Sequence, residues 1–206
     1  MTYAELQTYF RSLLNRRDIT ATLAKQFLQQ AIQRAQRTLR VPGMEVNFAY
    51  TVDDTYTKAY IPGDFLSLNY IYVEEGGLQK ASLAGVRALA RAETGVPRFF
   101  ARNSNYWEFG PAPQAGTVIT INYEANASNL VNDEDTNFLT DIAPDLIVYG
   151  ALSYACDYYI DDRASVFEAR FLQIIEELNM QANEEDLSGE PAIRPAYSMD
   201  FSDYPN

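Results

Sequence analysis

The chain of 206 residues contains no histidine and a single cysteine, Cys156. The absence of histidine excludes a Ser-His-Asp triad, a Cys-His catalytic pair and the Glu-x-x-His pairs of a di-iron bundle. One cysteine excludes a disulfide framework within the chain. Neither a glycine-rich phosphate loop nor a Gly-x-Ser-x-Gly elbow occurs in the sequence. These absences favour a structural or binding role, and we expect no catalytic residue, cofactor or bound metal.

Long hydrophobic runs are also missing. No apolar stretch approaches the roughly 20 residues that a membrane-spanning helix needs. The first ten residues, MTYAELQTYF, lack the basic-then-apolar order of a signal peptide. Hydrophobic residues nevertheless make up 47% of the chain, which is enough for a core. We therefore expect a soluble protein made in a reducing cytoplasm, without contact to a membrane.

Basic residues are scarce and unevenly placed. The net charge is −12, from 16 Lys and Arg against 28 Asp and Glu. Residues 1–44 carry a net +5, residues 45–123 a net −2 and residues 124–206 a net −15. This asymmetry predicts complementary surfaces, foremost within one fold and also between copies. The acidic surplus disfavours nucleic-acid binding, because it repels phosphates. It suits a surface along which DNA moves without binding.

The first 43 residues read as two helices. Thr2 and Glu5 form a capping box at the start of the first, which should end near residues 15–17. Asp18 or Thr20 caps the second, which ends at the Val41-Pro42-Gly43 stop. Its expected apolar stripe is Leu23, Phe27, Ala31, Ala35 and Leu39.

Residues 44–129 change to a period of two, which is typical of strands. Residues 46–50 alternate, and we expect residues 57–61 to return beside them as a hairpin. In the next strand Leu66, Leu68, Tyr70 and Tyr72 should share one face, with a turn at Gly76-Gly77. Further expectations are a short helix from Ser82 to Ala92, strands at residues 99–100, 107–109 and 118–123, and a polar loop over 124–136.

The helical period returns from Asn137. Pro144 should begin a helix that runs to about Asp161 and is buried on nearly all sides, Tyr158 and Tyr159 included. A last helix carries Phe167, Phe171, Ile174 and Leu178. The fold class is therefore α+β. The predicted parts are a helical bundle of residues 1–43 plus 130–186, an inserted antiparallel β-domain of residues 44–129, and an extended C-terminal arm of residues 187–206.

Two acidic constellations invite a metal hypothesis, and the residues argue against both. Asp133-x-Asp135-x-Asn137 opens like a calcium loop, but Phe138 replaces the glycine and Pro144 the bidentate glutamate. A solvated acidic loop is the simpler interpretation. Asp157 and Asp161 lie one helical turn apart and could share a face, with Arg163 close enough to neutralise one of them. A hydrolase that uses these carboxylates with Asp162 is the least favoured hypothesis.

Aromatic residues are abundant, with fifteen Tyr and eleven Phe, which is typical of large contact faces. Tyr106 and Trp107 could stack on sugars or bases, and a carbohydrate-binding β-sandwich is the alternative function. We favour Trp107 as a core residue and Tyr106 as an outward one. Tyr197, Met199, Phe201 and Tyr204 lie beyond the last predicted helix, where they suit either a docking arm or a disordered end.

The whole pattern resembles a known family, the head-to-tail adaptor proteins of tailed bacteriophages of the tail tubular protein A type. The order and spacing agree over about residues 3–180. The stretches that carry the resemblance are RTLRVPGME (37–45), IPGDFL (61–66), GVPRFF (95–100), EFGPAP (108–113), INY (121–123), NFL (137–139), PDLIVYGAL (144–152) and YYIDD (158–162).

The resemblance implies a structural protein of the virion at the junction of head and tail. It implies a dodecameric ring between the portal protein and the tail nozzle, with tail fibres as a further possible partner. DNA passes through the lumen without sequence-specific binding, so the protein serves DNA ejection. The residues expected at the partner interfaces are Arg34, Arg37, Arg40, Tyr197, Met199, Phe201 and Tyr204.

Overall fold

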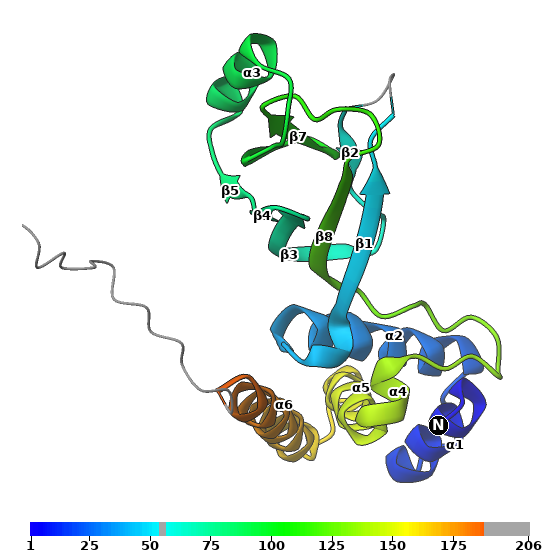
Figure 1. Cartoon of the computed structure of the whole chain (residues 1–206). Helices are drawn as coiled ribbons and strands as arrows, with labels where there is room; N and C mark the ends of the chain where they lie inside the picture. The colour runs from blue at the N-terminus through cyan, green and yellow to red at the C-terminus, as the bar shows by residue number, and fades with distance from the viewer. Residues whose placement is uncertain (54–56, 188–206) are drawn as a thin grey trace, which may run out of the picture.

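The computed structural model of the chain describes residues 1–53 and 57–187. Figure 1 shows a layer of helices with a β-rich part standing on it. The helices are α1 (Tyr3–Leu14), α2 (Ala21–Thr38), α3 (Leu83–Ala92), α4 (Phe138–Ile142), α5 (Pro144–Tyr158) and α6 (Ala164–Leu187), with a 3₁₀ turn, η1, at Pro42–Met44. The strands are β1 (Glu45–Thr51), β2 (Ala59–Tyr60), β3 (Phe65–Val73), β4 (Gly76–Gly77), β5 (Gln79–Lys80), β6 (Phe99–Asn103), β7 (Tyr106–Gly110) and β8 (Val118–Ala125). The α+β class is therefore confirmed.

Helix α5 is the centre of the helical layer and contacts α1, α2, α4 and α6. Most of its residues are buried, as the sequence predicts for a helix that is apolar nearly all round. Gly150 marks the closest approach: a Cβ there would lie 2.9 Å from the ring of Phe171 and 3.0 Å from the Cβ of Ala31. A larger residue at position 150 would therefore push α2 or α6 away from α5.

Local signals set the ends of these helices. The Thr2–Glu5 capping box is present, and the Thr20 hydroxyl accepts the Leu23 N–H at the start of α2. Helix α1 also receives support from the acidic loop, because the Tyr3 and Ala4 N–H groups donate to the carbonyl oxygens of Asp135 and Asp133. These contacts satisfy backbone donors that a helix start leaves free.

The strands form two sheets of four, in the orders β1-β8-β3-β4 and β2-β7-β6-β5. The predicted hairpin between residues 46–50 and 57–61 is wrong. Strand β1 pairs with β8 over its whole length, from Glu45 opposite Glu124 to Thr51 opposite Val118, while β2 joins β7 in the other sheet. The chain changes sheets between β1 and β2, and a period of two along one strand says nothing about which strand lies beside it.

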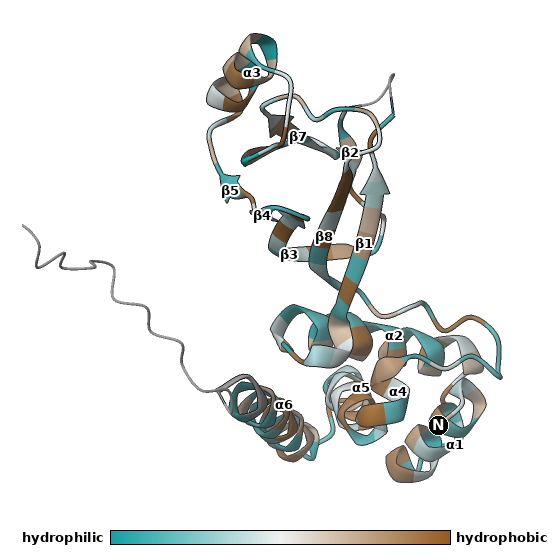
Figure 2. Cartoon of the chain, in the orientation of Figure 1, coloured by the Kyte–Doolittle hydropathy of each residue, from teal (hydrophilic) through white to brown (hydrophobic). Residues whose placement is uncertain are grey.

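The two sheets share one hydrophobic core. Trp107 is buried between Phe65 and Phe100, with ring centroids 5.9 and 5.6 Å away, so its core role is confirmed. Figure 2 shows a strongly hydrophobic stretch along β8, which supplies the buried Ile119 and Ile121.

The predicted face of β3 is wrong in its second half. Two irregularities in the pairing of β3 with β8 shift the alternation, so Ile71 and Val73 are buried whereas Tyr70 and Tyr72 are exposed. The turn after β3 is also misplaced, since Gly76–Gly77 is strand β4 and the turn lies at residues 74–75.

A second hydrophobic cluster lies in the helical layer. It draws its buried residues from 3–44 and 127–175, whereas the cluster between the sheets draws on residues 52–125. Leu66 of β3 packs on the helical cluster from the β side. Across the boundary Arg40 and Glu124 form an ion pair of 3.1 Å.

Two further boundaries differ from the predictions. Strand β8 continues to Ala125, so the polar loop begins at Asn126. Helix α5 ends at Tyr158, three residues before the predicted end, and Tyr158 is exposed. The four apolar residues predicted on the last helix do face the helical core, with Phe171 fully buried. Apart from Leu187, the predicted arm of residues 187–206 lies outside the described residues.

A buried carboxylate ties helix α3 to the sheet β2-β7-β6-β5. Glu108 of β7 accepts from both arms of the Arg87 guanidinium at 2.8 and 2.9 Å, from Lys58 at 3.0 Å and from Asn103 at 2.7 Å. Arg87 first, then Lys58 and Asn103, lower the pKa of Glu108 from 4.5 to about 2 against the opposing effect of burial. The carboxylate is thus held ionised by donors from three other segments of the chain.

Glu108→Gln should lower the free energy of unfolding by about 2 kcal/mol, since charge-assisted hydrogen bonds are lost in a buried place. Because the pKa of Glu108 is lower in the folded chain than the ordinary value of 4.5, its ionised carboxylate stabilises the fold fully at pH values above 4.5. This stabilisation is lost as the pH falls from 4.5 through about 2, where the folded chain also takes up the proton. Urea unfolding at a series of pH values should therefore show a smaller loss between pH 4.5 and 2 in the variant. The exposed Glu75→Gln is the control. Equal pH dependence in Glu108→Gln and the unmodified chain would contradict the role of Glu108.

Candidate interaction surfaces of the helical layer

The charge asymmetry of the sequence is partly neutralised inside the chain. Among the described residues, three ion pairs between side chains join the basic first 44 residues to the acidic last third: Lys25 with Asp133, Arg34 with Glu168 and Arg40 with Glu124. The prediction that the two ends pack side by side is therefore confirmed. The surplus of acidic groups over these pairs remains for other surfaces.

Arg34 belongs to this internal network. Its guanidinium binds both carboxylate oxygens of Glu168, one at 2.8 Å, and lies 4.5 Å above the ring of Phe171. Ser153 of α5 donates to the same carboxylate at 2.8 Å. Arg34 and then Ser153 lower the pKa of Glu168, while burial opposes them. The Arg34 side chain is 24% exposed, so it supports the contact of α2, α5 and α6 and leaves only an edge at the surface.

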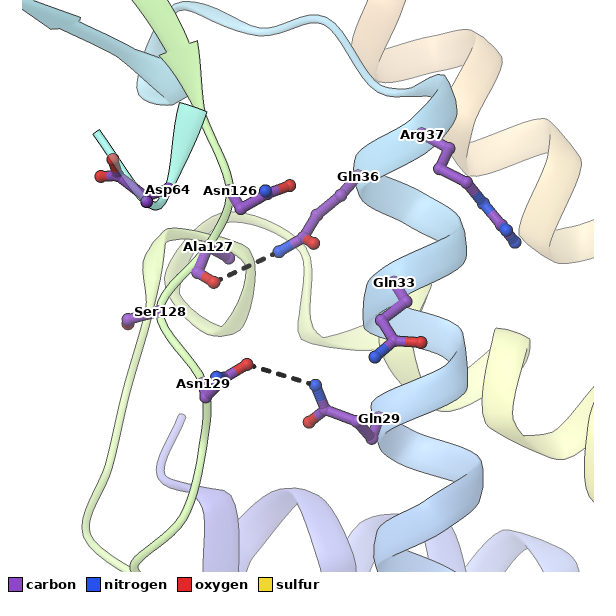
Figure 3. A pocket seen from close by; sticks show the side chains of 10 residues that line it. Gln29, Gln33, Gln36, Arg37, Asp64, Asn126, Ala127, Ser128 and Asn129 are labelled. Carbon is purple, nitrogen blue, oxygen red and sulfur yellow. Dashed lines mark hydrogen bonds between the residues drawn. The ribbon is translucent and has the colours of Figure 1, made fainter. Parts of the chain in front are cut away.

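Arg37 lies in a different setting, on the exposed side of α2. It lines a polar groove of about 640 Å³ between α2 and residues 126–129. Figure 3 shows Gln29, Gln33 and Gln36 along one side of α2, facing that segment. Two long hydrogen bonds of 3.4 Å cross the groove, from Gln36 to the Ala127 carbonyl and from Gln29 to Asn129.

The remaining predicted interface residues divide into two groups. The backbone N–H of Arg40 donates to Asn179 of α6 at 2.8 Å, and its side chain pairs with Glu124, so Arg40 ties the end of α2 to two partners within the chain. Tyr197, Met199, Phe201 and Tyr204 lie outside the described residues.

The acidic candidates for metal chemistry have structural partners. Asp135 accepts from the N–H groups of Val131 and Asn132 at 2.8 Å, and these bonds lower its pKa. Asn137 caps α4 by accepting the Thr140 N–H at 3.0 Å. Within residues 1–53 and 57–187, no three side chains of His, Cys, Asp or Glu gather as ligands for an ion.

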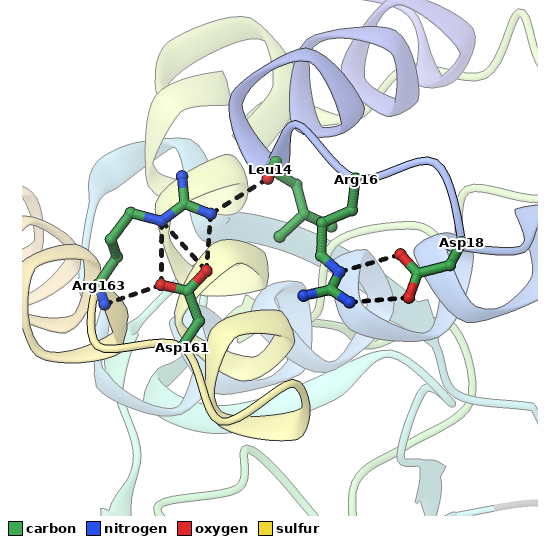
Figure 4. Close-up of polar contacts among 5 residues, drawn as sticks. All are labelled: Leu14, Arg16, Asp18, Asp161 and Arg163. Atoms are coloured by element: carbon green, nitrogen blue, oxygen red, sulfur yellow. Dashed lines mark hydrogen bonds and ion pairs between the residues drawn. The ribbon is translucent and has the colours of Figure 1, made fainter.

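The proposed face shared by Asp157 and Asp161 is wrong, because α5 ends before Asp161. Arg163 binds Asp161 through a forked contact of 2.7 and 3.0 Å and lowers the pKa of that carboxyl to about 2. The expectation that Arg163 neutralises one of the two carboxylates is thus confirmed. The same guanidinium donates at 3.2 Å to the carbonyl of Leu14, the last residue of α1 (Figure 4). The α5–α6 turn is thereby joined to the α1–α2 turn, where Arg16 pairs with Asp18.

Helix α5 ends in an unusual way. The Asp161 N–H donates to the Cys156 carbonyl at 2.8 Å and the Ile160 N–H to the Asp157 carbonyl at 3.2 Å, which is the pattern of a Schellman motif. Glycine normally occupies the left-handed position of that motif, because a side chain there meets the backbone. This chain instead places Ile160 there, with φ 55° and 94% of the residue exposed.

Other large apolar side chains are exposed on two sides of the molecule. On α6 they are Val166, Leu172 and Met180, at 52%, 52% and 56% exposure. On the β-rich part Tyr60, Tyr70, Tyr72 and Tyr106 are exposed. Buried Trp107 has no free face for a sugar, so the carbohydrate hypothesis loses its main residue, whereas Tyr106 does point outward as predicted.

The exposed apolar side chains of α6 and of the β-rich part agree with a protein that works through contacts with other proteins. A family model described as SU10 adaptor protein matches residues 1–195. This places the protein among the phage head-to-tail adaptors, which are structural proteins of the junction between virion head and tail. The chain belongs to the SU10 adaptor protein family.

No curated protein matches the sequence significantly. Across the described ranges, none of the helices has both the length and the hydropathy to cross a bilayer.

Sequence reasoning missed the part played by Ile160. The stretch YYIDD reads as a break between helices, and nothing in it shows that the break is a Schellman turn without glycine. The sequence offers one indirect signal: neither Gly nor Asn follows the last turn of this helix, although one of them commonly ends a helix.

Ile160→Gly should raise the free energy of unfolding of the isolated chain by about 1 kcal/mol, because the left-handed backbone costs an L-residue energy that glycine avoids. Urea unfolding measures the change. Ile160→Val is the matched control, since it keeps the β-branched side chain and should show no gain. A glycine variant no more stable than the valine variant would contradict the assigned strain.

Proposed function

We propose that the protein is the adaptor ring that joins the portal to the tail nozzle and forms part of the channel for DNA ejection. The match to the adaptor family over residues 1–195 carries this proposal. By analogy with the family resemblance, the ring contains twelve copies, and tail fibres are further candidates for contact. Synthesis in the host cytoplasm precedes incorporation into the virion.

The proposed organisation assigns different neighbours to the two parts of the molecule. Residues 1–43 and 130–186 act as the helical bundle, residues 44–129 as the inserted β-domain and residues 187–206 as the C-terminal arm. The bundle and the arm meet the portal, and the β-domain meets the tail. Support comes from the two separate hydrophobic clusters and from the exposed apolar side chains that each part presents.

The acidic surplus supports the channel proposal. Glu176, Glu177 and Glu184 are exposed on α6, and no ion pair between described residues includes them. A lumen lined by such groups repels the phosphates of DNA and keeps the duplex from sticking during passage.

Mixing the purified protein with the portal of the same phage should give a discrete complex of large mass in multi-angle light scattering. Deletion of residues 188–206 should weaken that complex, because the aromatic arm supplies part of the contact. Portal and adaptor measured alone are the controls. An unaffected complex would remove the arm from the interface, and the absence of any complex would reject the adaptor proposal.

Arg37→Glu should lower the affinity for the portal or for neighbouring copies by roughly tenfold, while the melting temperature stays unchanged, because Arg37 is exposed. Arg34→Glu is the contrasting variant: it faces Glu168 and should destabilise the chain itself. Adding Glu168→Arg to Arg34→Glu restores opposite charges and should recover stability. Normal assembly of Arg37→Glu would exclude Arg37 from the interfaces.

A further inference from the structure

The two sheets of the β-rich part differ in the sign of their charge. Strands β1, β8, β3 and β4 contain no Lys or Arg, and the turn between β3 and β4 adds the exposed Glu74 and Glu75. Helix α3 and the strands β2, β7, β6 and β5 contain one carboxylate, the buried Glu108. Their four basic residues are Lys80, Arg87, Arg91 and Arg102. In a chain of net charge −12, this separation gives the β-rich part a positive side and a negative side.

The positive side is organised by Glu108. Lys58 and Arg87 both bind this carboxylate, and their side chains are still 50% and 46% exposed. Arg91 follows Arg87 by one helical turn on the exposed side of α3. In the part of the chain that the structure describes, no ion pair includes Arg91. Three cations thus surround one carboxylate, so a net positive charge remains at the surface.

An aromatic pair lies on the same side of this sheet. Tyr60 of β2 and Tyr106 of β7 are cross-strand partners, with ring centroids 5.5 Å apart and exposures of 54% and 45%. Because side chains alternate along a strand, Tyr106 points to the same side of β7 as Glu108. Exposed rings beside exposed guanidinium groups are typical of protein–protein contacts. We call this surface the positive face, and its residues are Lys58, Tyr60, Arg87, Arg91 and Tyr106.

The negative side contains a hollow of about 350 Å³. Tyr72 and Val118 line it with exposures of 37% and 49%. Glu74 and Glu75 line it as well, and within residues 1–53 and 57–187 no ion pair includes either of them. These four residues form the negative face, which combines apolar surface with carboxylates that have no cation beside them in their own sheet.

The charges next to the two faces preserve this difference. Glu93, at the end of α3, pairs with Arg98 at 3.7 Å, so the two leave the sign of the positive face unchanged. Asp53 is a further exposed carboxylate near the hollow. It follows Val52, whose N–H donates to the carbonyl of Thr117 in the lining of the hollow. Opposite signs therefore extend beyond the residues that define the faces.

The two faces cannot meet within one chain. The hydrophobic cluster of residues 52–125 lies between the sheets, so their outer sides point in opposite directions. Figure 1 shows α3 and β1 on different sides of the β-rich part. A second copy of the chain, however, presents to each face the surface of opposite charge. A contact between two different faces of identical copies is heterologous, and repeated around an axis it closes into a ring.

We propose that the positive face of one copy docks on the negative face of the next copy. Lys58 and Arg91 then lie opposite Glu74 and Glu75, and the exposed tyrosines of the positive face cover the hollow. Because Glu108 already holds two of the cations, their side chains lose little freedom on docking. The inference deepens the proposed adaptor function by naming a contact between adjacent copies, and it rests on that function only for closure into a ring.

A zero-length crosslink tests the contact. A carbodiimide joins a carboxylate to an amine that touches it, and the lysines of the chain are Lys25, Lys58 and Lys80. The concentrated, unmodified chain should give a dimer band in which mass spectrometry finds Lys58 joined to Glu74 or Glu75. Lys58→Arg is the matched control, since it keeps the charge, removes the amine and should lose this crosslink. The absence of the crosslink from the unmodified chain would overturn the proposal.

Charge reversal separates docking from folding. Arg91→Glu and Glu75→Arg should each weaken self-association in sedimentation velocity by roughly tenfold, because like charges then face each other. Both residues are exposed, so the melting temperature should not change. An equal mixture of the two variants should associate normally, since each altered face meets a face of opposite charge on the other variant. The exposed Arg17→Glu and Glu134→Arg make the same changes in charge on the helical layer and are the matched controls. A mixture that associates no better than either variant alone would overturn the contact.

The portal complex distinguishes this contact from the adaptor function. A portal complex of normal mass that lacks the Lys58 crosslink would reject the contact and leave the adaptor function standing. The crosslink in the isolated chain, without any complex on mixing with the portal, would support the contact and reject the adaptor function.

Discussion

The helical layer depends on one helix that is covered on nearly every side. Helix α5 has no hydrophilic face wide enough to meet water, so α1, α2, α4 and α6 must all reach it, although α1 and α2 come from the opposite end of the chain. The close approach at Gly150 allows α2 and α6 to touch it at the same level. Burying such a helix therefore forces the two ends of the sequence together, and whatever lies between them has to leave and re-enter the layer.

Electrostatics follows the same geometry. The basic first helices and the acidic last helix lie on the two sides of α5, so their charges meet at its margins, as Arg34 and Glu168 do above Phe171. Pairing at these margins is limited because the acidic groups outnumber the basic ones by twelve. The excess therefore lies on the surface, where the proposed function has it face neighbouring copies and DNA.

Most of the helical layer was predictable from the sequence because helix signals are local. Thr2, Thr20 and Ser82 each cap the helix expected of them, and the apolar stripe of α2 faces the core. The strand partners were not predictable, since β1 finds β8 across more than sixty residues, while the irregular pairing of β3 reverses Tyr70 and Tyr72. Arg34 and Arg37 were predicted alike at partner interfaces, and Arg34 was not recognised as an internal residue, because helical spacing does not reveal that Glu168 lies opposite. Ile160 was missed because its importance lies in a backbone angle.

The pairing of β1 with β8 has a mechanical consequence. The chain leaves the helical layer after Met44 and returns at Ala127, and these two crossings are adjacent strands bonded to each other from Glu45 opposite Glu124 onward. A force that draws the β-rich part away from the helices therefore pulls both strands in the same direction. The two strands share the tension along their backbones. The hydrogen bonds between β1 and β8 are therefore neither sheared nor pulled apart one by one. If the helices face the portal and the β-rich part faces the tail, as proposed above, the connection is strongest along the direction that separates head from tail.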